Sequence, residues 1–285
     1  MKHLLRPYCA CLILLVLVFT VVPVYSAEVT VGLLAGSNKL GEVEEAAYAW
    51  AEENFKTTTL LVDKSGKFKN AGGTVLQPQE FAVLWLFYTE TDTLPEPILA
   101  DATIKAIHDY VEASGGLFLS ALALRYVVEL DVEDGGDPRV FTPLGKEPPE
   151  IGVVPTADGK KHPVFEGFDT SGPIFLTSMA QEGFTSDFHN FGGPPAGTIL
   201  ATKTRGGGAG AGERPFVEYE VGDGLIITLG HHNGVYTDTK SEEGDNLQKL
   251  TGNVLNYLAE NSAFLAVDPN GKLATTWGTL KALSK

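Results

Sequence analysis

The stretch Phe81-Ala-Val-Leu-Trp-Leu-Phe87 is apolar at every position. A strand with one solvated face alternates apolar and polar residues, whereas a strand covered on both faces is apolar throughout. Continuous apolar strands are typical of parallel sheets that carry helices on both sides. The stretch therefore predicts a central strand of an α/β protein.

The residues on either side of this stretch alternate between strand and helix patterns. Strand patterns occupy Val29–Ala35, Thr57–Val62 and Leu117–Leu119, and apolar residues at helical spacing occupy Glu42–Phe55 and Pro97–Ala113. This alternation predicts a doubly wound, mostly parallel sheet with helices on both faces. Ligands of such sheets bind beyond the carboxyl ends of the strands. The turns at those ends are Gly36–Leu40, Tyr88–Asp92 and Ser120–Leu124.

Two serines fall in these turns. Ser37 lies in the first, and Ser120 follows a helix, two glycines and a buried strand, which is the position of a nucleophile elbow. An elbow needs small residues two positions before and after the nucleophile, and here Phe118 and Leu122 are bulky. A helix N-cap is therefore the favoured role of Ser120, with the nucleophile as the alternative.

Histidines also follow a strand pattern in the second half of the chain. His231 and His232 come directly after the last strong strand and precede Asn233, while His189 lies two residues after Asp187. A site of His189, Asp187 and His231 or His232 is one reading, and hydrogen-bonded loop histidines are the other. The spacing matches no zinc or iron signature, so no metal and no cofactor is expected.

Two further clusters of residues can each be interpreted as an ordinary surface loop or as a binding site. The glycines of Gly206–Gly212 precede a strand pattern and not a helix, which favours a hairpin tip over a phosphate loop. The second cluster is acidic and lacks the regular spacing of a Ca²⁺ loop, which favours a solvated loop. Its members are Glu129, Asp131, Glu133, Asp134 and Asp137.

Met1–Ser26 combines a basic start, an apolar middle and small residues at its end, the pattern of a secretory signal peptide. Cleavage after Ser26 is favoured, with cleavage after Ala27 and an uncleaved membrane anchor as alternatives. We expect a secreted or periplasmic protein with a domain over residues 27–262 and a C-terminal tail over residues 263–285.

Both cysteines, Cys9 and Cys11, lie in this leader. The mature chain would have no disulfide, thiolate metal site or cysteine nucleophile. Because Lys2 and Arg6 leave with the leader, the formal net charge falls from −15 to −17. Such an acidic protein is not expected to bind nucleic acid or anionic lipid, and no second apolar run is long enough for a membrane span.

Several motifs in order resemble the trehalose-utilisation (ThuA-like) proteins of the class I glutamine-amidotransferase-like fold. They are an "HP-x-x-x-G-hydrophobic" segment, a strand ending in "LGH", a closing helix and the strand before the elbow. These motifs correspond to His162–Phe168, Gly222–His231, Asn246–Leu258 and Gly115–Ser120. The resemblance covers roughly Val29 to Glu260.

The resemblance implies a flavodoxin-like α/β sandwich and an association with carbohydrate use. In amidotransferases of this fold the elbow holds a cysteine, and a histidine followed two residues later by a glutamate completes the triad. Here Ser120 takes the cysteine position, His231 fits the histidine, and Asn233 stands in place of the glutamate. Glutaminase activity is therefore not expected.

Three hypotheses follow. The first is an exported ThuA-like domain that binds a small polar ligand, with a saccharide as the candidate, at the strand ends. The second is a serine hydrolase with Ser120 as nucleophile and His231 as base. The third is a catalytically degenerate structural or interaction module with a protein partner. The residues expected to contact the ligand of the first hypothesis are Ser37, Ser120, His189, His231, His232 and Asn233.

Overall fold

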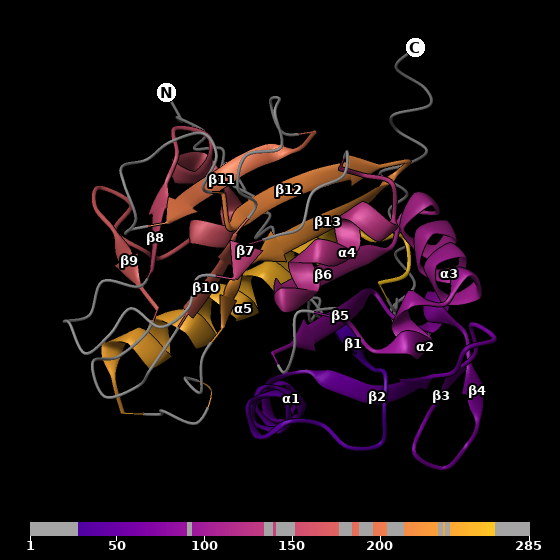
Figure 1. The fold of residues 1–285 in the computed structure, drawn as a ribbon. Coiled ribbons are helices and arrows are strands. Elements are labelled where there is room, and N and C mark those ends of the chain that lie inside the picture. The colour runs from indigo at the N-terminus through magenta and orange to yellow at the C-terminus, as the bar shows by residue number, and fades with distance from the viewer. Residues whose placement is uncertain are drawn as a thin grey trace, which may run out of the picture.

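The computed structural model describes residues 28–89, 93–133, 139–140, 152–176, 184–187, 196–203, 214–232, 236 and 240–265. The first half holds β1 (Thr30–Ala35), α1 (Glu42–Asn54), β2 (Lys56–Val62), β3 (Phe68–Lys69), β4 (Val75–Leu76), η1 (Pro78–Glu80), β5 (Val83–Tyr88), α2 (Glu96–Leu99), α3 (Asp101–Glu112), β6 (Gly116–Ala121), η2 (Leu122–Arg125) and α4 (Tyr126–Glu129). The second half holds β7 (Arg139–Val140), β8 (Gly152–Pro155), η3 (Gly159–Lys161), η4 (Pro163–Phe165), β9 (Ile174–Phe175), β10 (Phe184–Asp187), β11 (Thr198–Lys203), β12 (Phe216–Val221), β13 (Gly224–Leu229), β14 (His231–His232) and α5 (Glu242–Glu260) (Figure 1).

The main sheet has 11 strands in the order β4-β3-β2-β1-β5-β6-β13-β12-β11-β8-β9. The strands from β2 to β13 in this order pair in parallel, and the outer strands on both sides pair antiparallel. The α/β class is confirmed, but the expectation of a mostly parallel sheet is not, because the sheet is mixed. The reason lies in the turns: β12 and β13 are joined through Gly222 and Asp223 alone, and so short a hairpin connects only antiparallel neighbours.

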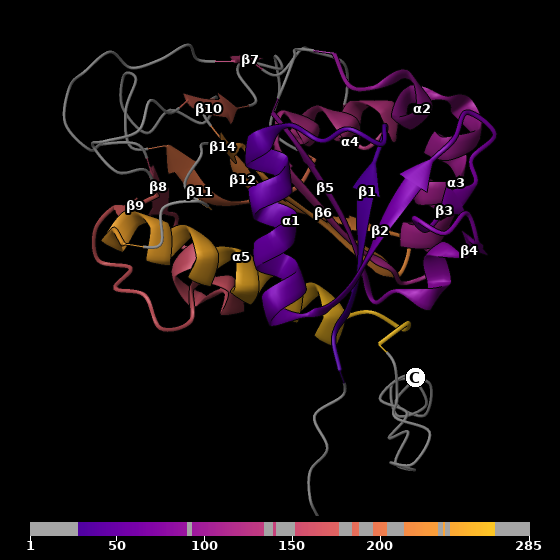
Figure 2. The same cartoon turned by 90° about the horizontal axis from the view of Figure 1, so that it is seen from below.

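The apolar stretch that predicted a central strand is β5, and its side chains do alternate between two cores. Val83, Trp85 and Phe87 belong to the core under α1 and α5, while Leu84 and Leu86 belong to the core under α3. Figure 2 shows α1 and α5 on one side of the parallel strands and α2, α3 and α4 on the other. Burial of each of these large side chains contributes about 1.5–3 kcal/mol, so both faces stabilise the sheet.

The helix expected over Pro97–Ala113 is interrupted. Ala100 is extended, with φ −68° and ψ 134°, and separates α2 from α3. Among the described residues, no helix has both the length and the apolar character that a bilayer crossing requires. The predicted leader and most of the predicted tail lie outside the described residues, and their boundaries stay predictions.

Candidate functional site

The carboxyl ends of the parallel strands form the edge at which sequence patterns predict a site. A small antiparallel sheet, in the order β14-β10-β7, lies at this edge (Figure 2). Its first strand, β14, follows β13 after the single residue Gly230 and contacts β6. Segments that are far apart in the sequence therefore meet at the end of β6.

The turn from β6 into η2 has the conformation of an elbow, and its special residue is Ala121. Ala121 has φ 58° and ψ −128°, a region that residues other than glycine rarely adopt. Such strained residues concentrate at functional turns, and the nucleophile of an elbow sits at the strained position itself. The elbow position is thus one residue later than the sequence pattern placed it, and its side chain is a methyl group that is fully buried.

Ser120 lies just before this position, and its side chain points into the core toward Trp85. Its side chain is 1% exposed, and its Oγ accepts a hydrogen bond from Nε1 of Trp85 at 2.6 Å. The expected N-cap role is wrong, because η2 begins at Leu122 and its N-cap residue is Ala121. Within the described residues, the hydroxyl of Ser120 serves to satisfy a buried indole N–H.

The other predicted site residues are only partly described. Ser37 is exposed in the turn after β1, where its Oγ donates to the carbonyl oxygen of Lys39 at 2.6 Å and accepts from the Lys39 N–H at 3.2 Å. The backbones of His231 and His232 form β14, next to β6, but their side chains lie outside the described part of the structure.

His189 and Asn233 lie outside the described residues altogether. The structure brings the backbone of β14 near Ser120, whereas β5 separates the strand of Ser37 from that of Ser120. At about 4.8 Å per strand, β1 and β6 are roughly 10 Å apart, so Ser37 and Ser120 do not form one cluster.

The sequence patterns did not identify a buried carboxylate that lies at the carboxyl edge of the parallel strands. Glu44, 4% exposed in the first turn of α1, accepts hydrogen bonds from the N–H of Gly41 and the N–H of Thr89, both at 3.0 Å. It thereby ties the turn after β1 to the residue after β5. A glutamate three residues after the helix-preceding Gly41 is a capping-box spacing, and this signal could have identified it.

Tyr48, one turn further along α1, makes a second hydrogen-bonded contact with the end of β1. Its hydroxyl donates to the carbonyl oxygen of Leu34 at 2.6 Å, at the end of β1. Burial raises the pKa of Tyr48, the hydrogen bond from the Phe87 N–H lowers it, and the charge of Glu44 raises it further. The phenol therefore stays protonated and acts as a donor that positions the end of β1.

The His162-Pro163 motif has a structural role in the described residues. Nε2 of His162 lies 3.0 Å from a carboxylate oxygen of Glu218 on β12, and the His162 ring packs edge-on against Tyr257 of α5 at 4.5 Å between centroids. Burial raises the pKa of Tyr257, and the neighbouring charge of Glu218 raises it further. The motif joins the η3–η4 segment to the sheet and to α5, away from the elbow.

One member of the acidic cluster, Glu133, forms a buried ion pair with Arg214. Glu133 is 6% exposed, not solvated as the loop reading implies, and its Oε1 lies 3.4 Å from Nη1 of Arg214. The hydroxyl of Tyr219 donates to the same oxygen at 3.0 Å. The glycines expected at a hairpin tip lie outside the described residues, but β11 and β12 on either side of them do pair antiparallel.

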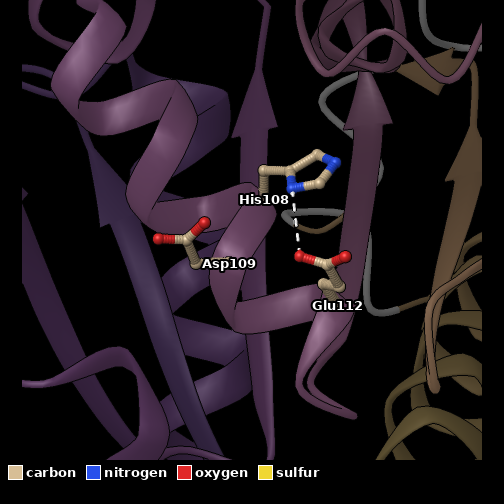
Figure 3. A group of neighbouring side chains, drawn as sticks. All are labelled: His108, Asp109 and Glu112. Carbon is tan, nitrogen blue, oxygen red and sulfur yellow. Dashed lines mark ion pairs between the residues drawn. The ribbon is translucent and has the colours of Figure 1, made fainter.

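One group of possible metal ligands occurs among the described residues, on the outer face of α3. Nδ1 of His108 faces Oε2 of Glu112 at 3.9 Å, with Asp109 beside them (Figure 3). Both carboxylate oxygens of Asp109 already accept from Nζ of Lys105, at 2.8 and 2.7 Å. All three side chains are at least partly exposed, so the group is an ordinary charged helix surface.

Comparison with solved structures shows which known proteins have a similar fold. The chain is similar to PurLQS from Thermotoga maritima, with a TM-score of 0.53 and 13% identity over 81% of this chain and 99% of that chain. It is also similar to a ThuA-like protein from Parabacteroides merdae, with a TM-score of 0.50 and 16% identity over 85% of this chain and 93% of that chain. No family model and no curated protein sequence matches the chain. The resemblance to ThuA-like and glutamine-amidotransferase-like proteins is thus confirmed at the level of the fold.

Proposed function

We propose that the chain is an exported domain of ThuA-like fold that binds a small polar ligand at the carboxyl edge of its parallel strands and performs no nucleophilic catalysis there. The proposal that no nucleophilic catalysis occurs there rests on Ala121. The strained turn that presents a nucleophile in related folds is retained, but its residue offers only a methyl group. A covalent acyl intermediate needs an oxygen, sulfur or nitrogen nucleophile at this point.

The ligand site is proposed on the exposed side of this edge. Open α/β sheets bind ligands where neighbouring strands diverge to different connections, beyond their carboxyl ends. Ser37 in the turn after β1 is exposed. The buried carboxylate of Glu44 fixes this turn, because it accepts hydrogen bonds from the N–H groups of Gly41 and Thr89. A turn fixed by buried hydrogen bonds is preorganised, so binding would cost little ordering entropy.

His189, His231, His232 and Asn233 stay proposed ligand contacts, since only the backbones of His231 and His232 are described. Imidazole and amide groups offer both donors and acceptors, which suits a hydroxylated ligand. Saccharides are the first class to test, in keeping with the carbohydrate association of the family that the sequence resembles. Export rests on the leader pattern of Met1–Ser26.

The test is a thermal-unfolding screen of the protein with neutral mono- and disaccharides. We expect one of them to raise Tm, and Ser37→Ala to reduce that rise. Glu260→Ala, exposed at the end of α5 near the start of β6 and so at the opposite end of the sheet, is the matched surface control and should leave it unchanged. Absence of any rise across the panel, or a rise that is equal in both variants, would overturn the proposal.

The serine-hydrolase alternative is tested in the same preparation. A fluorophosphonate reacts with activated serine nucleophiles, and we expect no labelling of the folded protein because Ser120 faces Trp85. Labelling that disappears in Ser120→Ala would support the hydrolase instead. A protein that binds a partner chain but no small molecule would favour the interaction module.

A further inference from the structure

A recess lies at the end of the sheet opposite the proposed ligand site, between α1 and α5. It has a volume of about 1000 Å³ and opens beside the starts of β1 and β2. One wall is the last turn of α1, and the other is a face of α5 that runs from Asp245 to Asn256. We call this recess the α1/α5 groove; Figure 2 shows the two helices that border it.

The groove has a polar lining around one aromatic side chain. Trp50 is partly buried, lines the groove and packs against Phe55 at 6.0 Å between centroids. Side-chain amides line the walls on both helices, including Asn54 on α1 and Gln248 and Asn256 on α5. A side-chain amide both donates and accepts hydrogen bonds while it stays neutral.

Gly252 keeps the groove open beside Trp50. Glycine destabilises a helix interior relative to alanine, so it needs a reason there. The backbone at Gly252 has no positive φ, and the first atom that an added Cβ would meet is the ring edge of Trp50 at 4.0 Å, an ordinary contact. The fold does not require this glycine, whereas a larger side chain would occupy the groove.

Gln248 adds an independent sign that the groove wall is incomplete without a ligand. Its Nε2 is buried and has no hydrogen-bond partner among the described residues. Nearly all buried polar atoms in folded proteins are paired with protein or water. An amide with an unused donor can turn about its last torsion to pair with a group that enters the groove.

The charges of the groove argue against an anionic ligand. Its two lysines are engaged, Lys56 with Glu28 at 3.1 Å and Lys249 with the carbonyl oxygen of Gly167. Its other charged side chains, Glu53 and Asp245, are exposed carboxylates. Phosphates and nucleic acids would meet net negative charge here.

The lining also argues against a peptide. An amphipathic helix needs an apolar groove, and an extended peptide needs an open sheet edge. This groove is polar, and its border strands β1 and β2 each have pairing partners on both sides. The geometry points to a binding site for a neutral oligosaccharide, with sugar hydroxyls paired to Asn54, Gln248 and Asn256 and a sugar face against Trp50.

The experiment is calorimetric titration of the full chain with cellohexaose, maltohexaose and mannohexaose. We expect one of them to bind, and Gly252→Leu to weaken binding at least tenfold by filling the groove while it improves the helix. Asn256→Ala, on the exposed wall, should weaken binding as well. Glu260→Ala, which is exposed on the same helix outside the groove, is the matched control and should bind like the wild type.

Two outcomes would overturn the inference: no heat with any of the three oligosaccharides, or unchanged affinity in Gly252→Leu. Ser37→Ala separates this site from the one proposed at the carboxyl edge, because it leaves groove binding intact. A ligand whose affinity falls in Ser37→Ala and not in Gly252→Leu belongs to the carboxyl edge and counts against the groove.

Discussion

Nε1 of Trp85 donates to Oγ of Ser120 at 2.6 Å in a part of the core where both side chains are at most 1% exposed. The pair joins adjacent strands β5 and β6, and five aromatic rings surround the indole: those of Tyr48, Trp50, Phe87, Phe118 and Tyr236. A hydroxyl in such a place satisfies a donor that has no access to water. It is a structural hydroxyl next to the strained turn at Ala121.

We predict that Ser120→Ala lowers the free energy of unfolding by about 1–3 kcal/mol, because it leaves the Trp85 N–H buried without an acceptor. Urea denaturation followed by circular dichroism measures this. The double variant Ser120→Ala/Trp85→Phe removes both partners, and we expect its loss to be smaller than the sum of the two single losses. Additive losses would show that the hydrogen bond contributes nothing.

The strained conformation of Ala121 gives a second prediction. A β-branched side chain at φ 58° is a steric outlier, and the site is fully buried. Ala121→Val should therefore cost more than Ala123→Val, which overpacks an equally buried alanine without positive φ. We expect the difference in unfolding free energy to be about 1–3 kcal/mol. Equal costs at the two positions would contradict a strained elbow.

Most of the fold could be predicted from local patterns. Apolar runs and helical spacing located β1, α1, β2, β5, β6 and α5, because each of these elements buries a face that its own sequence encodes. The mixed pairing of the sheet was not predicted, since it depends on how the outer strands on both sides of the parallel ones, β3 and β4 as well as β8, β9, β11 and β12, meet their neighbours. The turn at Gly222-Asp223 was visible, but a hairpin turn fixes the direction of only one pair of strands.

The site was harder to predict than the fold. The elbow was found in the sequence but was off by one residue, because a strand pattern does not reveal which residue takes the positive φ. Glu44 was missed because a glutamate in the first turn of a helix is usually exposed. Glu133 was grouped with solvated carboxylates, since its partner Arg214 lies 81 positions later in the chain and only the fold brings them together.

That buried pair gives a third prediction. Removal of one partner from a buried ion pair leaves an uncompensated charge, so Glu133→Ala should lower the unfolding free energy by about 3–5 kcal/mol. Replacement of both charges, as in Glu133→Leu/Arg214→Met, should recover most of that loss. Chemical denaturation of the wild type, Glu133→Ala and the double variant measures the three free energies of unfolding. If the double variant is less stable than Glu133→Ala, the pair is not the source of the loss.

Buried tyrosines give the protein a predicted alkaline limit. Burial raises the pKa above the ordinary 10.0 at Tyr48, Tyr110, Tyr126, Tyr219 and Tyr236. A raised pKa means that the folded state keeps protons which the unfolded state releases. The resulting stabilisation is complete below about pH 10 and is lost as the pH rises further, by about 1.4 kcal/mol per pH unit for each such tyrosine.

Urea denaturation at several pH values above neutrality measures this slope, with tyrosinate absorbance as the second signal. We expect the absorbance of the buried tyrosines to rise together with unfolding, and Tyr236→Phe to make the slope less steep by one proton. Tyr236 is suited to the test because, among the described residues, its hydroxyl forms a hydrogen bond only with Thr251, at 2.7 Å. Ionisation of all the tyrosines near pH 10 with circular dichroism unchanged would contradict the prediction.

Gly252 links stability to the α1/α5 groove. Its backbone is compatible with any residue, and an added methyl group would touch only the ring edge of Trp50 at 4.0 Å. Gly252→Ala should therefore raise the unfolding free energy by about 0.5–1 kcal/mol through helix propensity. Thermal and urea unfolding measure the gain, with the exposed α5 substitution Asn256→Ala as the comparison for propensity alone. If Gly252→Ala is destabilising, close packing explains the glycine, and an open groove is no longer needed to account for it.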